Sequence, residues 1–542
     1  MMQTCPARPR AGSLHPYWSQ SIVQRSFAAF TFFALLFTTV NAPAQAASDA
    51  AAPATKVFHV KSRLVLLDVV VTDRNGKPVN DLKRQDFAVY EDKQPQRISS
   101  FEVPAQHALP PARQTAAKFN PDDVQAFGQS PVTVIVLDEL NTHFADTDFA
   151  KRSIRQFLEK RPATLNEPTM LLSVGNSKFN MLQNFTRSRA DLLNALNNHK
   201  PSYSWKLEIG MSTGPQASER LDLSINALEQ IAEYTARIPG RKNLIWVGQG
   251  FPSLDTDALA TQDVKALTDM MRHITDTLLD ARVTMFAVDP SSNAVGNTDI
   301  VDENQAEFAQ FVGDSAGAGH LMDPFNSQLD FDRLGPVTGG RVLRGMNDVD
   351  HQIAASIELG TQFYSIGYTP GNPSEESTAF RHIVVKCLRP GTTVMTRDGY
   401  YPGAQARQGS TDNISYDLNN AVMAELLFTA LRIRVEPKGG DLYTIYVAAP
   451  GMTWEQADGA VAGGHVAHAE VLAASFSAKD KLLAHTLQTM TATATAEANV
   501  HSPSLPADFT ISLARPKGTV RMRFIVRDVA SGSMGSFDLR LP

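Results

Sequence analysis

Cysteine is almost absent from this sequence, which contains only Cys5 and Cys387 in 542 residues. Two cysteines exclude a disulfide-rich scaffold and a thiolate metal cluster. The sequence also has no long Lys/Arg run, and its formal charge is −6 at pH 7, so we expect no nucleic-acid partner. Hydrophobic residues make up 43% of the chain, which excludes a wholly disordered protein and, at this length, indicates several domains.

Signatures of common enzymes are also missing. There is no phosphate-binding loop, no dinucleotide fingerprint after a strand and no His-Glu-x-x-His zinc motif. Gly210–Gly214 matches the Gly-x-Ser-x-Gly pattern around a serine nucleophile, Ser212. That pattern needs a strand before it and a helix after it, whereas here a short charged segment precedes it and Pro215 follows. His320 and His351 lie downstream, but nothing places them near Ser212, so we predict a loop without a catalytic serine.

Residues 1–47 have the composition of a secretory signal, with three arginines and no acidic residue. Phe27–Val40 is an apolar run, and Ala44 and Ala46 follow at the spacing of a signal-peptidase site. We predict cleavage near residue 47 and export to the periplasm, the cell envelope or the medium. The alternative is a retained membrane anchor, although the apolar run is shorter than the roughly 20 residues that a spanning helix needs.

Residues 57–104 alternate apolar and polar side chains on both sides of a turn at Asn75-Gly76. Strand–turn–strand repetition without helical periodicity predicts a small antiparallel β-module. Residues 105–130 have no periodicity and contain Pro110-Pro111, which predicts a linker.

Residues 131–403 change to buried strands that alternate with amphipathic helices. Continuous apolar runs at 132–137, 169–174, 243–248 and 283–288 are typical of strands buried on both faces. The segments between them repeat apolar residues at helical spacing. This alternation predicts an α/β fold with a doubly wound, mostly parallel sheet and helices on both faces.

Two further predictions concern the end of this region and the residues after it. We expect 363–368 to be the last strand of the α/β sheet and 381–403 to form a terminal β-hairpin. Residues 404–415 are polar and read as a second linker, and 416–542 alternate strand patterns with turns. The expected fold class is therefore a doubly wound α/β domain flanked by N-terminal and C-terminal all-β sandwich domains.

The segment 132–368 resembles a von Willebrand factor A (VWA) domain. Its first strand ends in Asp138, within LDELNT, where that family places an Asp-x-Ser-x-Ser metal motif, and NLIWVGQGF resembles the strand before another metal loop. Longer segments are similar to a narrower family of secreted bacterial VWFA-related proteins, known chiefly from Acidobacteria. These segments are RLVLLDVVVTDRNGKPVNDLKRQDFAVYEDKQPQRISSFE, TGGRVLRGMND, FYSIGYTP and RDGYY.

The resemblance implies a metal-ion-dependent adhesion site at the carboxyl edge of the sheet. Asp138, Thr142 and Thr186 match its ligand positions. Leu140 replaces a serine and Gln249 replaces an aspartate, so two of the oxygen ligands that Mg²⁺ or Ca²⁺ prefers are missing. We therefore expect a degenerate site in which Mg²⁺ or Ca²⁺ binding is weak or absent.

Other assignments of these residues stay open at the level of sequence. Glu139, Asn141 and Asp146 could compensate for the missing ligands. Asp138 could instead have a structural role, with its carboxylate accepting hydrogen bonds from backbone N–H groups before the next helix.

The leading functional expectation is an exported, non-enzymatic protein that binds a protein partner through the VWA-like domain. Open α/β sheets present ligands beyond the carboxyl ends of their strands, which here means residues 138–148, 175–188 and 248–257. The alternative is a scaffold or assembly factor of the cell envelope that binds through its β-domains, and a serine hydrolase is third. A membrane contact is expected only through an uncleaved signal segment.

Overall fold

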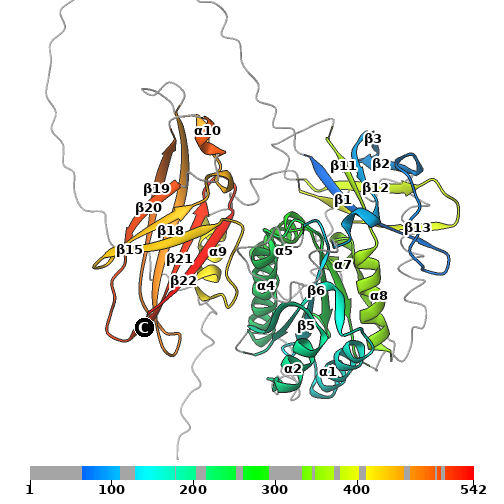
Figure 1. The fold of residues 1–542 in the computed structure, drawn as a ribbon, viewed down its shortest axis with the longest axis horizontal. Coiled ribbons are helices and arrows are strands. Elements are labelled where there is room, and N and C mark those ends of the chain that lie inside the picture. The colour runs from blue at the N-terminus through cyan, green and yellow to red at the C-terminus, as the bar shows by residue number, and fades with distance from the viewer. Residues whose placement is uncertain are drawn as a thin grey trace, which may run out of the picture. The chain divides into compact units, whose positions relative to one another are not determined.

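Helices and strands occupy most of the residues that the computed structural model describes (Figure 1). All of these residues belong to Lys61–Pro542, one of the two compact units into which the chain divides. The predicted signal segment lies outside them. No described helix is both long and apolar enough to cross a membrane. The described residues are 64–109, 128–176, 179–202, 215–251, 261–291, 333–344, 348–370, 379–401, 411–456, 464–494, 497–501 and 507–541.

A mixed six-stranded sheet forms the centre of the α/β domain. Its strand order is β10-β9-β8-β5-β6-β7, and neighbouring strands are parallel except for the antiparallel pair β6 and β7. The predicted mixed α/β architecture is therefore confirmed, with the strand over 179–188 at the edge. The strands are β5 (Val132–Asp138), β6 (Thr164–Val174), β7 (Phe179–Ser188), β8 (Lys242–Val247), β9 (Val283–Val288) and β10 (Arg341–Leu343).

Helices cover both faces of this sheet because its central strands are apolar on both sides. In β5, Val134 and Val136 face one apolar cluster, and Ile135 and Leu137 face the other. The first cluster is covered by α4 (Pro215–Thr235), α5 (Thr261–Asp280) and α7 (Leu334–Val337). The second is covered by α1 (Phe144–Glu159), α2 (Arg189–Asn198) and α8 (Val349–Thr361).

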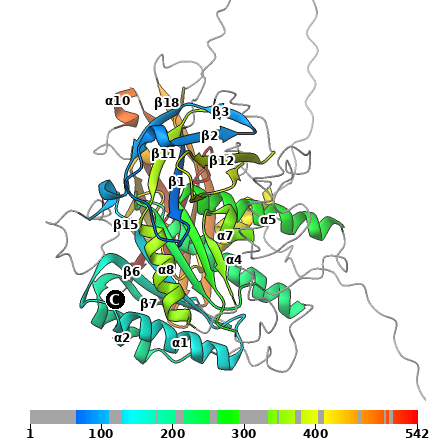
Figure 2. The same ribbon diagram turned by 90° about the vertical axis from the view of Figure 1, so that its right-hand side faces the viewer.

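The N-terminal β-unit is assembled from two segments that are distant in the sequence, which corrects the expected module over 57–104. Strand β1 pairs antiparallel with β11 and β13, and β2 pairs with β12, so β1 and β11 lie side by side (Figure 2). The two sheets, β13-β1-β11-β4 and β14-β12-β2-β3, enclose one apolar core. The strands are β1 (Val65–Asp73), β2 (Phe87–Glu91), β3 (Gln94–Gln96), β4 (Ile98–Glu102), β11 (Tyr364–Tyr368), β12 (Arg381–Cys387), β13 (Thr392–Met395) and β14 (Gly399–Tyr400).

One prediction made for residues 363–403 was wrong, because the strand expected to end the α/β sheet is β11, which belongs to the β-unit. The hairpin expected at 381–403 is present in part: β12 pairs antiparallel with β14, as predicted, but β13 pairs with β1 and β12 also pairs with β2. Alternating burial identifies a strand and its faces, but the choice of partner strand depends on tertiary contacts. Cys387 is a free, half-buried cysteine in β12.

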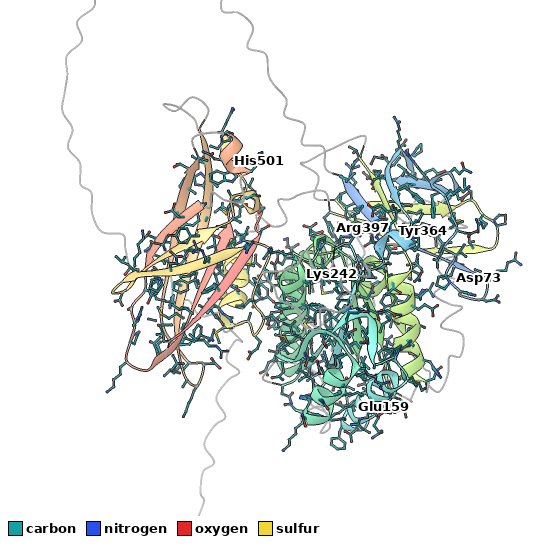
Figure 3. The ribbon with its side chains drawn as sticks, in the orientation of Figure 1. Asp73, Glu159, Lys242, Tyr364, Arg397 and His501 are labelled. Atoms are coloured by element: carbon teal, nitrogen blue, oxygen red, sulfur yellow. The ribbon has the colours of Figure 1, made fainter. Side chains whose placement is uncertain are left out.

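Buried charges join the β-unit to the amino-terminal end of the central strands. Arg282 donates a 2.6 Å hydrogen bond to Asp68 of β1, and Arg241 lies over the ring of Phe363. Lys242, at the start of β8, is also buried (Figure 3). Burial lowers the pKa of Arg241 to about 10. Burial alone would raise the pKa of Asp68, but the two nearby arginines outweigh it and lower that pKa.

The C-terminal domain is a β-sandwich preceded by a helix. Helix α9 (Thr411–Met423) includes residues 411–415, which were expected to be linker. Sheets β15-β16-β20 and β17-β18-β21-β22 enclose one core, β19 pairs with β18, and α9 covers the other side of β18 and β21. The strands are β15 (Ile433–Gly439), β16 (Leu442–Val447), β17 (Glu455–Gln456), β18 (His465–Ser477), β19 (Leu482–Ala494), β20 (Ala507–Ser512), β21 (Thr519–Asp528) and β22 (Met534–Arg540). Further short helices among the described residues are η1 (Arg84–Asp86), η2 (Pro104–His107), η8 (Ala449–Gly451) and α10 (Glu497–Val500).

Candidate functional site: the carboxyl edge of the central sheet

The central parallel strands end together at one edge of the sheet. Asp138 at the end of β5 is in register with Val174 of β6, and the preceding Leu137 is in register with Val247 of β8. The loops that leave these strands therefore meet, as the sequence predicted for residues 138–148 and for the start of 248–257. Residues 252–257 lie outside the part of the chain that the structure describes.

Asp138 is fully buried, and the protein itself supplies donors to both of its carboxylate oxygens. Oδ1 accepts hydrogen bonds from the backbone N–H groups of Leu140 and Asn141, both at 2.9 Å, and Oδ2 accepts one at 3.0 Å from the indole of Trp246. Burial raises the pKa of Asp138 to about 6 despite these donors. The structural role considered for Asp138 is thus present in the observed contacts.

Glu139 holds the loop that follows α2 against this edge. Its Oε1 contacts Nε2 of His199, and its Oε2 accepts a 2.7 Å hydrogen bond from the backbone N–H of Ser202. Glu139 is completely buried, so these contacts compensate for the desolvation of its carboxylate. His199 and Ser202 belong to no recognisable motif, so the sequence alone does not identify them as part of this edge.

Asn141 links the same loop to helix α4. Its Nδ2 donates a 2.9 Å hydrogen bond to Ser224, and its Oδ1 accepts a 3.2 Å bond from Arg220. Burial lowers the pKa of Arg220, and the nearby Asp138 opposes that change. Asn141 therefore connects the loop after β5 to helix α4, and these contacts make the loop more rigid.

Thr142 and Gln249 connect the loop after β5 to the loop after β8 through a hydrogen bond. The Oγ1 atom of Thr142 accepts a 3.1 Å hydrogen bond from the backbone N–H of Gln249, whose side chain donates a 3.1 Å bond to Asp146. A side chain at Gly248 would collide with Asp138, since an added Cβ would lie 2.4 Å from the Cβ of Asp138. Only glycine permits this close approach.

Thr186 does not belong to this edge, which corrects its assignment as a metal ligand. Strand β7 is antiparallel, and Thr186 is in register with Thr169, which is in register with Thr133 at the opposite end of β5. Asp138 is five residues further along β5, which corresponds to about 16 Å along the strand direction. Thr186 instead accepts a hydrogen bond from the backbone of Ser188, and the later part of the 175–188 segment leaves the predicted surface.

The described residues of this edge do not fit a divalent cation. Leu140 is buried and contributes no side-chain oxygen, and both oxygens of Asp138 are occupied by N–H donors. The three residues considered as compensating ligands, Glu139, Asn141 and Asp146, each contact other protein groups. Trp246 directs an N–H donor at the carboxylate, where a cation would need a lone pair. The described residues of this edge therefore form a hydrogen-bonded network and not a ligand set for a metal ion.

The rim of the edge is exposed and partly apolar. His143 is exposed, and the side chain of Phe144, the first residue of α1, is 49% exposed. Most large hydrophobic side chains of the α/β domain are buried, so Phe144 stands out as an apolar group beside a rigid polar network.

The potential catalytic residues do not form a constellation in the described structure. Ser212 and His320 lie outside the described residues. His351 is on the surface of α8, where Asp348 and Asp350 are 3.7 and 4.0 Å away. The predicted absence of a catalytic serine stays a prediction.

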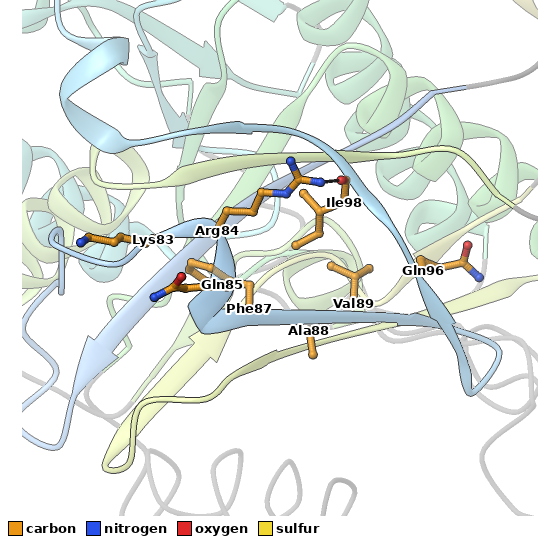
Figure 4. A pocket seen from close by; sticks show the side chains of 8 residues that line it. All are labelled: Lys83, Arg84, Gln85, Phe87, Ala88, Val89, Gln96 and Ile98. Atoms are coloured by element: carbon orange, nitrogen blue, oxygen red, sulfur yellow. Dashed lines mark hydrogen bonds between the residues drawn. The ribbon is translucent and has the colours of Figure 1, made fainter.

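A hollow of about 450 Å³ lies on the β-unit (Figure 4). Arg84 reaches across it to donate a hydrogen bond to the carbonyl oxygen of Ile98. Its lining includes no carboxylate, histidine, serine or cysteine, and Lys83 is the one lining side chain of a type that can serve as a base or nucleophile. The lining residues are Lys83, Arg84, Gln85, Phe87, Ala88, Val89, Gln96 and Ile98.

Comparisons with known proteins give no family. No family model and no curated protein matches the chain. Proximal thread matrix protein 1 from the mussel byssus is similar in two crystal forms. The first has 10% sequence identity and a TM-score of 0.19, and the match covers 29% of this chain and 37% of that protein. The second has 11% sequence identity and a TM-score of 0.24, and the match covers 44% of this chain and 48% of that protein. A point mutant of the PilB minor pilin from Streptococcus sanguinis has 10% identity and a TM-score of 0.24, covering 43% of this chain and 61% of that one. The chain thus spans less than two thirds of each of these proteins, and the low TM-scores define neither fold family nor function.

Proposed function

We propose that this chain is an exported, non-enzymatic binding protein whose VWA-like domain recognises a protein partner at the carboxyl edge of its central sheet. The observation that carries the proposal is the exposed Phe144 at the start of α1, directly after a loop that buried polar contacts hold in place. The strand order of the sheet and its antiparallel edge strand β7 are consistent with the VWA resemblance of the sequence. The signal-like N-terminus supports export.

The loop after β5 is suited to binding a protein partner because it is rigid. Side chains that are ordered before binding lose little conformational entropy when a partner docks. Aromatic residues at the centre of an interface commonly contribute most of the binding energy. Because the described edge does not fit a cation, recognition here depends on shape and side chains, and it requires no metal.

A site-specific photo-crosslinker at position 144 tests the proposal in the exporting cell. The expected result is one dominant crosslinked protein, with the same yield in EDTA. The matched control places the crosslinker at Met423, an exposed hydrophobic residue at the end of α9, which should not give this product. A Phe144→Ser variant should also lose at least tenfold in affinity for the captured protein. Equal crosslinking from both positions, or crosslinking abolished by EDTA, contradicts the proposal.

A second candidate function, a scaffold of the cell envelope, is favoured by strand β19. This strand has 13 residues, pairs with β18, and is mostly exposed, with Leu487 51% exposed. Its sequence, LLAHTLQTMTATA, has no proline and no acidic or basic residue other than histidine, which suits pairing with a strand of another chain. A Thr489→Pro variant that loses envelope association while crosslinking at 144 persists would favour the scaffold.

A further inference from the structure

Three helices that are far apart in the sequence bring a histidine and two carboxylates together. Glu229 lies on α4, His273 on α5 and Asp417 on α9, and one ligand atom from each lies within 4.8 Å of the others. Nε2 of His273 is 3.1 Å from Oδ1 of Asp417. That separation is close to the distance between two ligands that each lie about 2.1 Å from one ion.

The group is buried, and two of its polar atoms have no hydrogen-bond partner. Asp417 is 4% exposed, and its Oδ1 atom has no hydrogen-bond partner although it faces His273. Nδ1 of His273 also has none. A buried polar atom without a partner costs about 1–3 kcal/mol, so a native structure needs a reason to keep one.

The arginine nearest to this group is shared between two carboxylates. Arg527 lies 3.8 Å from Asp417 and also contacts Glu470 at 3.1 Å, so one buried cation is shared by two carboxylates. Glu229 accepts a hydrogen bond from the neutral amide of Asn420 at 2.5 Å.

We propose that Glu229, His273 and Asp417 bind a divalent transition-metal ion, Zn²⁺ being the best fit, that fixes helix α9 to helices α4 and α5. Imidazole nitrogen and carboxylate oxygen are both normal zinc ligands, whereas Mg²⁺ and Ca²⁺ prefer sets made only of oxygen. Two ligands of one such ion are at most about 4.2 Å apart, so small side-chain movements close the site. The fourth position is available to water or to the amide oxygen of Asn420.

The role of the ion follows from the two faces of α9. Leu418 and Val422 pack against the C-terminal sandwich, while Asp417 and Asn420 face α4 and α5. An ion held by all three helices therefore adds a bond between the α/β domain and the C-terminal domain. This site is distinct from the carboxyl edge and does not depend on the function proposed for it.

Zinc binding is tested on the full chain purified without a histidine tag and stripped with EDTA. Competition titration against a chromogenic chelator should show one Zn²⁺ per chain, and Mg²⁺ should not displace it. The variants His273→Gln, Asp417→Asn and Glu229→Gln should each weaken binding at least tenfold. Zn²⁺ should raise the melting temperature of the wild type by a few degrees and leave that of the variants unchanged.

His351→Gln is the matched control, because His351 also lies near two aspartates but is exposed. It should bind Zn²⁺ like the wild type. Glu229→Gln is nearly isosteric and keeps an acceptor for Asn420, so it remains informative if the histidine variant does not fold. Hydrogen exchange in α9 should slow when Zn²⁺ is added to the wild type only.

The proposal is overturned if the wild type binds no Zn²⁺ above the level of His273→Gln. It is also overturned if binding persists in both Asp417→Asn and Glu229→Gln, or if His351→Gln loses it equally. In those cases the group is an ion pair between His273 and its two acidic neighbours.

Discussion

Replacing Asp138 with asparagine tests whether the carboxyl edge is a hydrogen-bonded structural device or a metal site. Asparagine keeps one carbonyl oxygen, which can still accept from Leu140 and Asn141, but its amide would direct a donor at the indole N–H of Trp246. Losing a charge-assisted bond costs about 1.5–3 kcal/mol. Removing the buried charge stabilises the folded state by a comparable amount. A pKa near 6 instead of 3.8 means that burying the ionised carboxylate costs about 3 kcal/mol at pH 7.

The dependence on pH separates these two effects. The pKa of Asp138 is raised in the folded state, so the stability it contributes is fully present below pH 3.8 and is lost as the pH rises to about 6. The asparagine variant does not titrate there. The free energy of unfolding of the wild type relative to Asp138→Asn should therefore be about 1.3 kcal/mol larger at pH 5 than at pH 7.

Urea unfolding at both pH values, in EDTA and again in millimolar Mg²⁺, followed by tryptophan fluorescence and circular dichroism, measures this difference. Asp280→Asn removes an exposed carboxylate from the end of α5 and serves as the control for loss of one charge. A cation bound to Asp138 would lower the pKa of its carboxyl group and reverse the trend. A difference that is equal or smaller at pH 5 would refute the buried, metal-free assignment.

The remaining predictions concern stability, metal response and catalysis. Asp68→Asn should lower the free energy of unfolding by about 1.5–3 kcal/mol at pH 7, since it removes a charge-assisted hydrogen bond from the partly buried Arg282, whereas the surface change Asp269→Asn should cost less than about 1 kcal/mol in the same urea assay. The Asp68 deficit should shrink below pH 3.8, because a lowered pKa contributes stability that is lost in acid. Millimolar Mg²⁺ should barely change the melting temperature, and Thr186→Ala should not alter that response; a large shift lost in this variant would contradict the register of β7. Fluorophosphonate labelling should be equal in wild type and Ser212→Ala, and labelling of the wild type alone would identify a nucleophile.

The central sheet could be predicted from sequence because its strands are buried on both faces. The continuous apolar run at Val132–Leu137 and the helical spacing along α5 each have one simple structural explanation. Strand β11 was misplaced because its apolar pattern also suits an α/β sheet, and only pairing with β1 assigns it to the β-unit. Local sequence patterns therefore predicted the positions of helices and strands more reliably than they predicted which strands pair.

The candidate sites were less predictable because they depend on contacts between distant segments. Asp138 could be found from its place at the end of a buried strand. Thr186 was misassigned because the direction of β7 is invisible in its composition, and reversal of that one strand moves the residue to the opposite edge. Glu229, His273 and Asp417 share no motif, since they are brought together by packing of three helices.

The charged groups at the two junctions of the α/β domain differ in how completely they are paired. At the junction with the β-unit, Asp68 is matched by Arg282, with the arginine Nη2 atom 2.6 Å from the carboxylate, so the pair is complete within the chain. At the junction with the C-terminal domain, Asp417 faces His273 through an oxygen that accepts no hydrogen bond, and it shares Arg527 with another carboxylate. A buried charge is retained at low cost only when an opposite charge and donors surround it. The stability of the first junction should therefore be independent of metal ions, whereas the second should become more stable when a cation binds between Glu229, His273 and Asp417.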